Sequence, residues 1–174
     1  MSKKSAKSER SGPSKKTADV TPETADTGET EEYVTMLIGD QWFGIPVLGV
    51  QEVLGSQKIA RVPLAPSEVA GNLNLRGRIA TAIDIRTRLG MPARPEGHGG
   101  MSVVVDRGGE LYSLVIDTVG EVLKLSSAEF EHNPPTIKAN LRELSKGIYR
   151  LADKLLVVLD VERVLEKGSQ AQAA

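Results

Sequence analysis

Few residues of this chain have side chains suited to catalysis or metal binding. The sequence has no cysteine, which excludes disulfides, thiol nucleophiles, iron–sulfur clusters and cysteine-bound zinc. Only two histidines occur: His98 stands in the glycine-rich stretch at 97–100 and His132 stands in a loop beside Asn133. Metal sites that use imidazole generally need several such ligands close together. We therefore expect solvent-facing histidines, no metal and no cofactor.

Two carboxylates, Asp84 and Asp160, are the remaining candidates for acid–base chemistry. Each directly precedes a short apolar segment of helical character, a position typical of a helix N-cap rather than a catalytic acid. The chain also lacks the phosphate-loop, dinucleotide, zinc-protease and serine-hydrolase motifs. The prediction is that the protein is not an enzyme. A small enzyme using Asp84 or His98 remains as a remote alternative.

An arginine-rich segment is the more unusual feature. It begins with Gly71-Asn-Leu-Asn-Leu-Arg-Gly-Arg78, and it places Arg76, Arg78, Arg86 and Arg88 within 13 residues against the single acid Asp84. Asparagine and arginine between glycines indicate a bent backbone that projects a side chain. A solvated basic face and a binding surface both explain this composition.

Charge over the whole chain argues against a polyanionic partner. Residues 1–32 hold six basic and seven acidic residues, which leaves 16 of each in residues 33–168. The chain has only six aromatic residues, whereas single-stranded nucleic-acid binders need aromatic platforms on a basic surface. A neutral body favours protein or small-molecule partners and no nucleic acid. No stretch reaches the ~18 apolar residues of a membrane helix, so we expect no membrane insertion.

Composition divides the chain into three parts. Residues 1–32 are almost free of apolar side chains and are predicted to form a disordered tail. Residues 33–168 form the folded body, and residues 169–174 a short frayed end.

Short runs in which apolar and polar residues alternate, separated by turn residues, form the elements that position the charged and polar candidates. We expect strands at 33–38, 42–45, 79–85, 101–105, 111–116, 148–151 and 155–159. Helical segments are expected over 47–54 after Pro46, near Ser67, over 85–89 between Asp84 and Gly90, after Ser126, and over 161–167 between Asp160 and Gly168. Residues 90–100 form a connector.

An internal repeat indicates two similar units. VQEVL at 50–54 recurs as VGEVL at 119–123, and DIRTRL at 84–89 recurs as DVERVL at 160–165. Two units of short strands predict a mainly β protein built of two small barrels. Because a barrel of this size is only marginally stable alone, we expect the two barrels to pack against each other along a shared seam. We place the first unit at about 40–95 and the second at about 100–165, with the strand at 33–38 free to join the second.

Several motifs resemble one known family. They are the G-x-x-N-L-R-G stretch at 71–77, I-x-x-x-I-D-I-R at 79–86, FGIPVLGVQEVL at 43–54, VIDTVGEVLKL at 115–125 and KGIYRLADKLLVVLDVERVL at 146–165. Together they resemble the chemotaxis coupling protein CheW family over about 33–167. The sequence departs from this pattern at Asn72-Leu73, which we expect to touch the partner-facing loop and to influence partner choice.

The resemblance implies a fold and a function. The fold would be two SH3-like five-stranded β-barrel subdomains with short helices. The function would be that of a non-catalytic cytoplasmic adaptor that couples methyl-accepting chemotaxis receptors to the CheA histidine kinase, recruited to membrane-associated receptor arrays. An alternative is the same adaptor in a non-flagellar chemosensory pathway that serves surface motility or second-messenger control.

The resemblance also implies two sets of contact residues. Val50, Glu52 and Gly71 match positions implicated in kinase docking. The receptor-facing groove between the barrels is matched by Asn74, Leu75, Arg76, Val119 and Val122.

Overall fold

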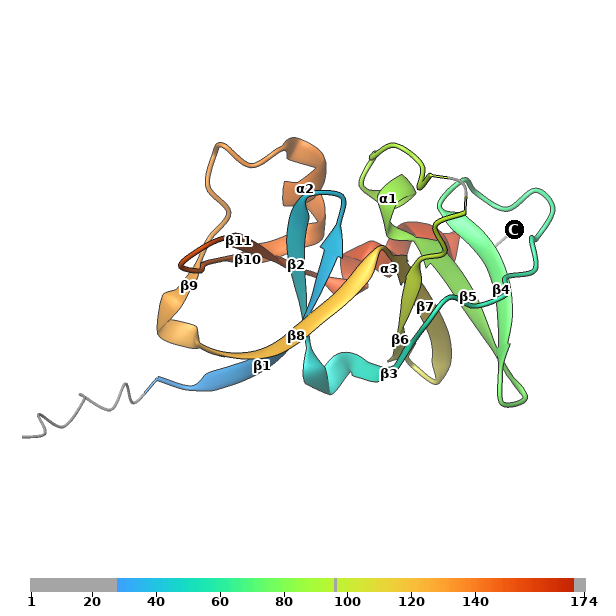
Figure 1. Cartoon of the computed structure of the whole chain (residues 1–174), viewed down its shortest axis with the longest axis horizontal. Coiled ribbons are helices and arrows are strands. Elements are labelled where there is room, and N and C mark those ends of the chain that lie inside the picture. Colours follow the sequence, from blue (N-terminus) through green and yellow to red (C-terminus); the bar gives the residue numbers. More distant parts are fainter. Residues whose placement is uncertain (1–27, 96, 171–174) are drawn as a thin grey trace, which may run out of the picture.

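The computed structural model describes residues 28–95 and 97–170 and shows two β-sheets side by side (Figure 1). The six-stranded sheet has the order β8 (Thr118–Ser126), β1 (Thr30–Ile38), β2 (Gln41–Pro46), β11 (Leu155–Leu159), β10 (Ser145–Arg150) and β9 (Phe130–Glu131). The five-stranded sheet has the order β3 (Val50–Leu54), β6 (Met101–Arg107), β7 (Glu110–Ile116), β5 (Arg78–Asp84) and β4 (Val69–Leu75). The mainly β architecture of two units with five main strands each is confirmed, since β9 adds only two residues.

Short helices connect the strands. They are the 3₁₀ turns η1 (Val47–Gly49) and η2 (Ser127–Glu129) and the α-helices α1 (Ile85–Arg88), α2 (Ala139–Leu144) and α3 (Val161–Gln170). The Asp84 carboxylate accepts a 2.9 Å hydrogen bond from the Arg86 N–H, and the Ser126 hydroxyl accepts one from the Ala128 N–H. The cap predicted at Asp84 is therefore confirmed, and Ser126 caps the helical turn expected after it. The predicted stop at Gly168 is wrong, because α3 continues to Gln170.

The two sheets exchange a strand. β3 follows the β1–β2 hairpin in sequence, yet it pairs with β6 of the other sheet. Reciprocally, β8 follows the β6–β7 hairpin and pairs with β1. Each sheet then adds one parallel neighbour, β11 beside β2 and β5 beside β7.

This exchange changes the expected boundaries of the two units. The strand at 41–46 lies in the sheet with β10 and β11 rather than in a first unit of residues 40–95, and the strand at 33–38 lies there too. Residues 101–116 belong to the sheet of β3, β4 and β5 rather than to a second unit at 100–165. The sequence repeat suggested that each unit is one continuous stretch of chain, because a repeat along the sequence does not reveal which strands pair.

Two helix predictions are wrong. The segment at 50–54 is the strand β3, and only Val47–Gly49 is helical. The side chains of β3 alternate between half-buried and exposed, with the period of two that belongs to a strand. No helix forms near Ser67 either, where two turn residues lead directly into β4. In both segments β-branched valines favour the extended backbone.

One apolar core joins the two sheets. Met36 and Phe43 from the six-stranded sheet are fully buried in the same cluster as Ile83 and Leu114 from the five-stranded sheet. Burying side chains of this size contributes roughly 1.5–3 kcal/mol each. The shared seam expected from the small size of each unit is therefore present.

A partly buried ionic cluster also joins the units. Asp117, between β7 and β8, accepts hydrogen bonds from the guanidinium groups of Arg86 (2.8 and 2.5 Å) and Arg94 (2.9 Å) and from the Gly39 N–H (2.7 Å). The Arg86 hydrogen bonds are the main cause that holds the pKa of Asp117 well below its usual range. The Asp117 carboxylate therefore links the β1–β2 turn, α1 and the connector at 90–100 through hydrogen bonds.

The first strand begins earlier than expected. Glu31 and Glu32, assigned above to the tail, pair with Leu125 and Lys124 of β8, and the Tyr33 hydroxyl donates a 2.7 Å hydrogen bond to Glu31. The rest of the predicted tail, residues 1–27, lies outside the described residues, as do residues 171–174 of the predicted frayed end.

Candidate functional site

The β4–β5 hairpin presents the arginine that the sequence singled out. Its two-residue turn consists of Arg76 (φ 52°) and Gly77 (φ 87°), both with the positive φ that a type I′ turn requires. The Asn74 side-chain oxygen accepts a 2.8 Å hydrogen bond from the Gly77 N–H. The segment is thus a strand and a tight turn rather than a loop.

The backbone of Arg76 is in an unfavourable conformation for its residue type. At the β6–β7 turn the same two positions are Gly108 and Gly109, which adopt positive φ without a steric penalty. Arginine has a Cβ, and a left-handed conformation costs roughly 1–2 kcal/mol for such a residue. Strain at an exposed position points to a function for the side chain rather than for the turn.

The Arg76 side chain forms an ion pair with Glu52 of β3. The two side chains approach to 2.5 Å, and 83% of the Arg76 side chain is exposed against 28% for Glu52. The Arg76 side chain therefore lies against the edge strand β3 of its own sheet. Glu52 and Arg76, matched above to different partners, are in direct contact.

This ion pair lies where the five-stranded sheet curls on itself. β3 and β4 are its two edge strands, and the Glu52–Arg76 pair connects them at one end. Ala60, in the segment between β3 and β4, also exchanges two backbone hydrogen bonds of 2.8 Å with Asn72 of β4. A pocket of about 220 Å³ lies beside the pair and is lined by Gln51, Glu52, Leu75, Arg76, Arg78, Val104 and Leu111.

Gly71 is buried under this closure. A Cβ at Gly71 would lie 2.1 Å from the Ala60 carbonyl oxygen, and its φ of 146° also disfavours a side chain. Gly71 therefore allows the segment at Ala60 to pack close to β4 and has no side chain to offer a partner. Leu73, part of the departure at Asn72-Leu73, is buried with Ala80 and Ala82, so its side chain contributes to the packing of this sheet.

The other expected receptor residues lie in the six-stranded sheet. Val119 of β8 is half-buried against the shared core, whereas Val122 is 56% exposed opposite Val34 of β1. The receptor set is therefore divided between β8 and the β4–β5 hairpin, which belong to different sheets.

The exchanged strands carry matching exposed valines. Val53 of β3 and Val122 of β8 occupy the same position of the VQEVL and VGEVL repeat, and both side chains are exposed. Val50 is half-buried against the shared core, as Val119 is. Val53 was not among the contact residues expected from the sequence, although its position in the repeat is the same as that of Val122.

The two carboxylates considered as catalytic candidates, Asp84 and Asp160, lie at helix starts, with the Asp160 carboxylate 3.4 Å from the Arg163 N–H. Within residues 28–95 and 97–170, no group of three potential metal ligands is arranged to hold an ion. None of the helices in this described part of the chain is long and apolar enough to cross a membrane.

Fold and site together define a class of protein. Two strand-exchanged β-sheets present a charged hairpin tip and exposed valines on edge strands, which are features of a protein-binding module. The CheW-like domain family model matches residues 32–169, and the chain therefore belongs to the CheW family.

Individual relatives agree with this assignment. The Chemotaxis protein CheW of Helicobacter pylori is 29% identical over 142 residues, which cover 82% of this chain and 86% of the relative. That of Klebsiella aerogenes is 27% identical over 146 residues, which cover 83% and 88%. The crystal structure of the scaffolding protein TtCheW from Thermoanaerobacter tengcongensis matches with a TM-score of 0.71 at 26% identity, over 79% of this chain and 94% of that one.

Proposed function

We propose that this protein is a non-catalytic adaptor that couples methyl-accepting chemotaxis receptors to a CheA-type histidine kinase. The observation that carries the proposal is the family match over residues 32–169, which includes both sheets and both exchanged strands. The relatives named as chemotaxis proteins support the same pathway. In this role the protein acts in the cytoplasm and is recruited to receptor arrays at the membrane.

The proposed contacts fall on two adjoining surfaces. Val50 and Glu52 of β3 contact the kinase, and Gly71 acts by allowing β4 to pack close to Ala60. Asn74, Leu75 and Arg76 contact the receptor at the hairpin tip, and Val119 and Val122 do so on β8. Because Glu52 and Arg76 form one ion pair, the kinase and receptor surfaces meet there.

Capture experiments with the full chain test the proposal. The wild-type protein, immobilised and exposed to lysate of its own cells, is expected to retain a histidine kinase and methyl-accepting receptors, identified by mass spectrometry. Val122→Asp is expected to lose the receptors and keep the kinase, since Val122 is exposed and its replacement leaves the core intact. Lys146→Glu, an exposed change on β10, serves as the matched control.

The identity of the captured receptor also separates the two pathways. Receptors of flagellar chemotaxis support the main proposal, and receptors of a surface-motility or second-messenger system support the alternative. Recovery of neither kinase nor receptor by the wild-type protein would overturn both.

A further inference from the structure

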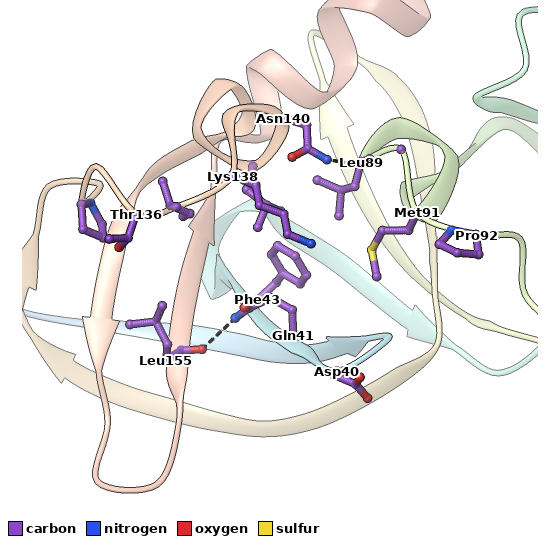
Figure 2. A pocket seen from close by; sticks show the side chains of 14 residues that line it. Asp40, Gln41, Phe43, Leu89, Met91, Pro92, Thr136, Lys138, Asn140 and Leu155 are labelled. Atoms are coloured by element: carbon purple, nitrogen blue, oxygen red, sulfur yellow. Dashed lines mark hydrogen bonds between the residues drawn. The ribbon is translucent and has the colours of Figure 1, made fainter.

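A second concave site lies on the side of the molecule that carries α1 and α2. It is a pocket of about 520 Å³ between the β1–β2 turn, the end of α1, the segment before α2, and β11 (Figure 2). None of the proposed kinase or receptor residues lines it. Its volume falls in the range of ordinary small-molecule sites, which often lie between structural units.

The lining of the pocket is more apolar than polar. The partly buried side chains of Met91, Ile137 and Leu141 line it, and the fully buried Phe43 and Leu89 lie beneath them. These residues come from β2 of the six-stranded sheet, from α2 and the segment before it, and from the end of α1, which follows β5 of the other sheet. The lining therefore forms only when the two units are packed together. The pocket can therefore take an apolar group and remove it from water.

Two hydrogen bonds hold the walls in place. The Asn140 side-chain amide donates to the Leu89 carbonyl and so links α2 to the end of α1. The Gln41 side-chain amide donates to the Leu155 carbonyl at 2.9 Å and links β2 to β11, as Figure 2 shows. A pocket whose walls are already fixed loses little conformational entropy when a ligand binds.

One cation, the exposed Lys138, lies at the rim of the pocket. Figure 2 shows the Lys138 ammonium reaching into the pocket, whereas the Asp40 carboxylate points away from it. No ion pair within the described part of the chain involves Lys138, and its side chain makes no capping hydrogen bond to α2. The Asp40 carboxylate instead contributes to the raised pKa of Arg86. The main cause of that shift is the hydrogen bonding to Asp117, and the charges of Asp84 and Asp40 add smaller effects.

We propose that this pocket binds a small amphipathic anion, namely a carboxylate with an aliphatic or arylalkyl body. The apolar body packs against Met91, Ile137 and Leu141, above the buried Phe43 and Leu89. The carboxylate accepts a charge-assisted hydrogen bond from Lys138 at the rim. The proposal is independent of the adaptor function, because it uses other residues on another side of the fold.

The test uses sodium octanoate as the probe and the intact protein. The chain has four methionines, so methyl-¹³C-methionine labelling gives a simple spectrum in which Met91 reports on the pocket and buried Met36 on the core. Octanoate is expected to bind saturably at one site and to shift the Met91 methyl signal while the Met36 signal stays in place. The neutral analogue octan-1-ol is expected to bind at least about tenfold more weakly.

Two lysine variants locate the charge contact. Lys138→Met keeps an apolar stem of similar length and is expected to reduce octanoate affinity about tenfold with octanol affinity unchanged. Lys146→Met removes an exposed lysine outside the pocket and is expected to bind octanoate as the wild type does. Equal octanoate affinity of wild type and Lys138→Met would overturn the proposal. So would the absence of saturable binding, or a shift of Met36 without a shift of Met91.

Discussion

The Glu52–Arg76 ion pair is the feature that most changes the interpretation of individual residues. Sequence resemblance matched the two residues to different partners, but their side chains are 2.5 Å apart. An exposed ion pair of this kind contributes only about 0.2–1 kcal/mol to stability. Since stability gives little reason for a strained arginine, binding is the better explanation of Arg76.

Replacing Arg76 with asparagine separates binding from folding. Arg76→Asn creates the Asn-Gly pair that type I′ turns prefer, so the melting temperature is expected to stay the same or rise by a few degrees. Receptor affinity is expected to fall roughly 30-fold, as at a central arginine contact worth about 2 kcal/mol. Thermal unfolding and receptor-dependent kinase activation measure the two effects. A lower melting temperature with full activation would show that Arg76 is a structural brace.

Reversing the charge of Glu52 tests the kinase surface. Glu52→Lys places a second cation beside Arg76, so it removes the ion pair and alters the charge that faces the kinase. Affinity for the purified kinase regulatory domain is expected to fall at least about tenfold, whereas unfolding free energy changes by about 1 kcal/mol or less. Titration calorimetry and urea unfolding measure both. Glu121→Lys, an exposed change on β8, is the control and is expected to leave kinase affinity intact.

Asp117 is predicted to make stability depend on pH. Its folded-state pKa is held below the unfolded value of about 3.9, chiefly by hydrogen bonds from Arg86, so the carboxylate stabilises the fold above that value. The stabilisation is lost as pH falls through the folded-state pKa. Asp117→Asn is expected to cost about 1–3 kcal/mol at pH 7 and clearly less at pH 3, as measured by urea unfolding. An equal cost at both pH values would contradict this assignment.

The strand β1 shows how an element can begin before its apolar pattern does. Thr30, Glu31 and Glu32 are polar, but they pair with Ser126, Leu125 and Lys124 of β8 through backbone groups. Backbone hydrogen bonding does not depend on side-chain polarity, so composition alone placed the start of the strand too late.

Two truncations measure the contribution of this strand. Removing residues 1–27 is expected to leave the melting temperature unchanged, because almost nothing apolar is lost. Removing residues 1–32 also deletes three pairs with β8 and the Glu31–Tyr33 hydrogen bond, and the melting temperature is expected to fall by several degrees. Circular dichroism measures both, with kinase binding as a check on the fold. Equal melting temperatures would show that the early pairs contribute nothing.

At the scale of the whole molecule, strand exchange makes the two units interdependent. Each sheet contains a strand that follows the other sheet's hairpin, and one core contains residues from both. The units are therefore expected to fold as a single cooperative system rather than one after the other.

Cutting the chain in the connector tests this interdependence. Fragments 1–98 and 99–174 are each expected to lack a cooperative thermal transition, because each sheet then misses strands that the other fragment carries. An equimolar mixture is expected to recover part of the native circular dichroism. A cooperative transition in either isolated fragment would refute the prediction.

Local chemistry was sufficient to predict several elements of this protein. Asp84 was predicted as a cap from its position, and the strands predicted at 101–105 and 111–116 are present as β6 and β7. These features depend on residues close in sequence. The motifs at 71–77 and 146–165 likewise predicted the family that the comparison confirms.

Only the tertiary structure decided which strands pair and which side chains meet. VQEVL fits a helix or a strand as a short apolar run, and β3 forms because β6 offers a paired edge. Glu52 and Arg76 are 24 residues apart, and their contact requires the five-stranded sheet to curl. The pocket near Lys138 likewise requires segments from both units. Such contacts depend on long-range pairing, which residue types and spacing along one chain do not specify.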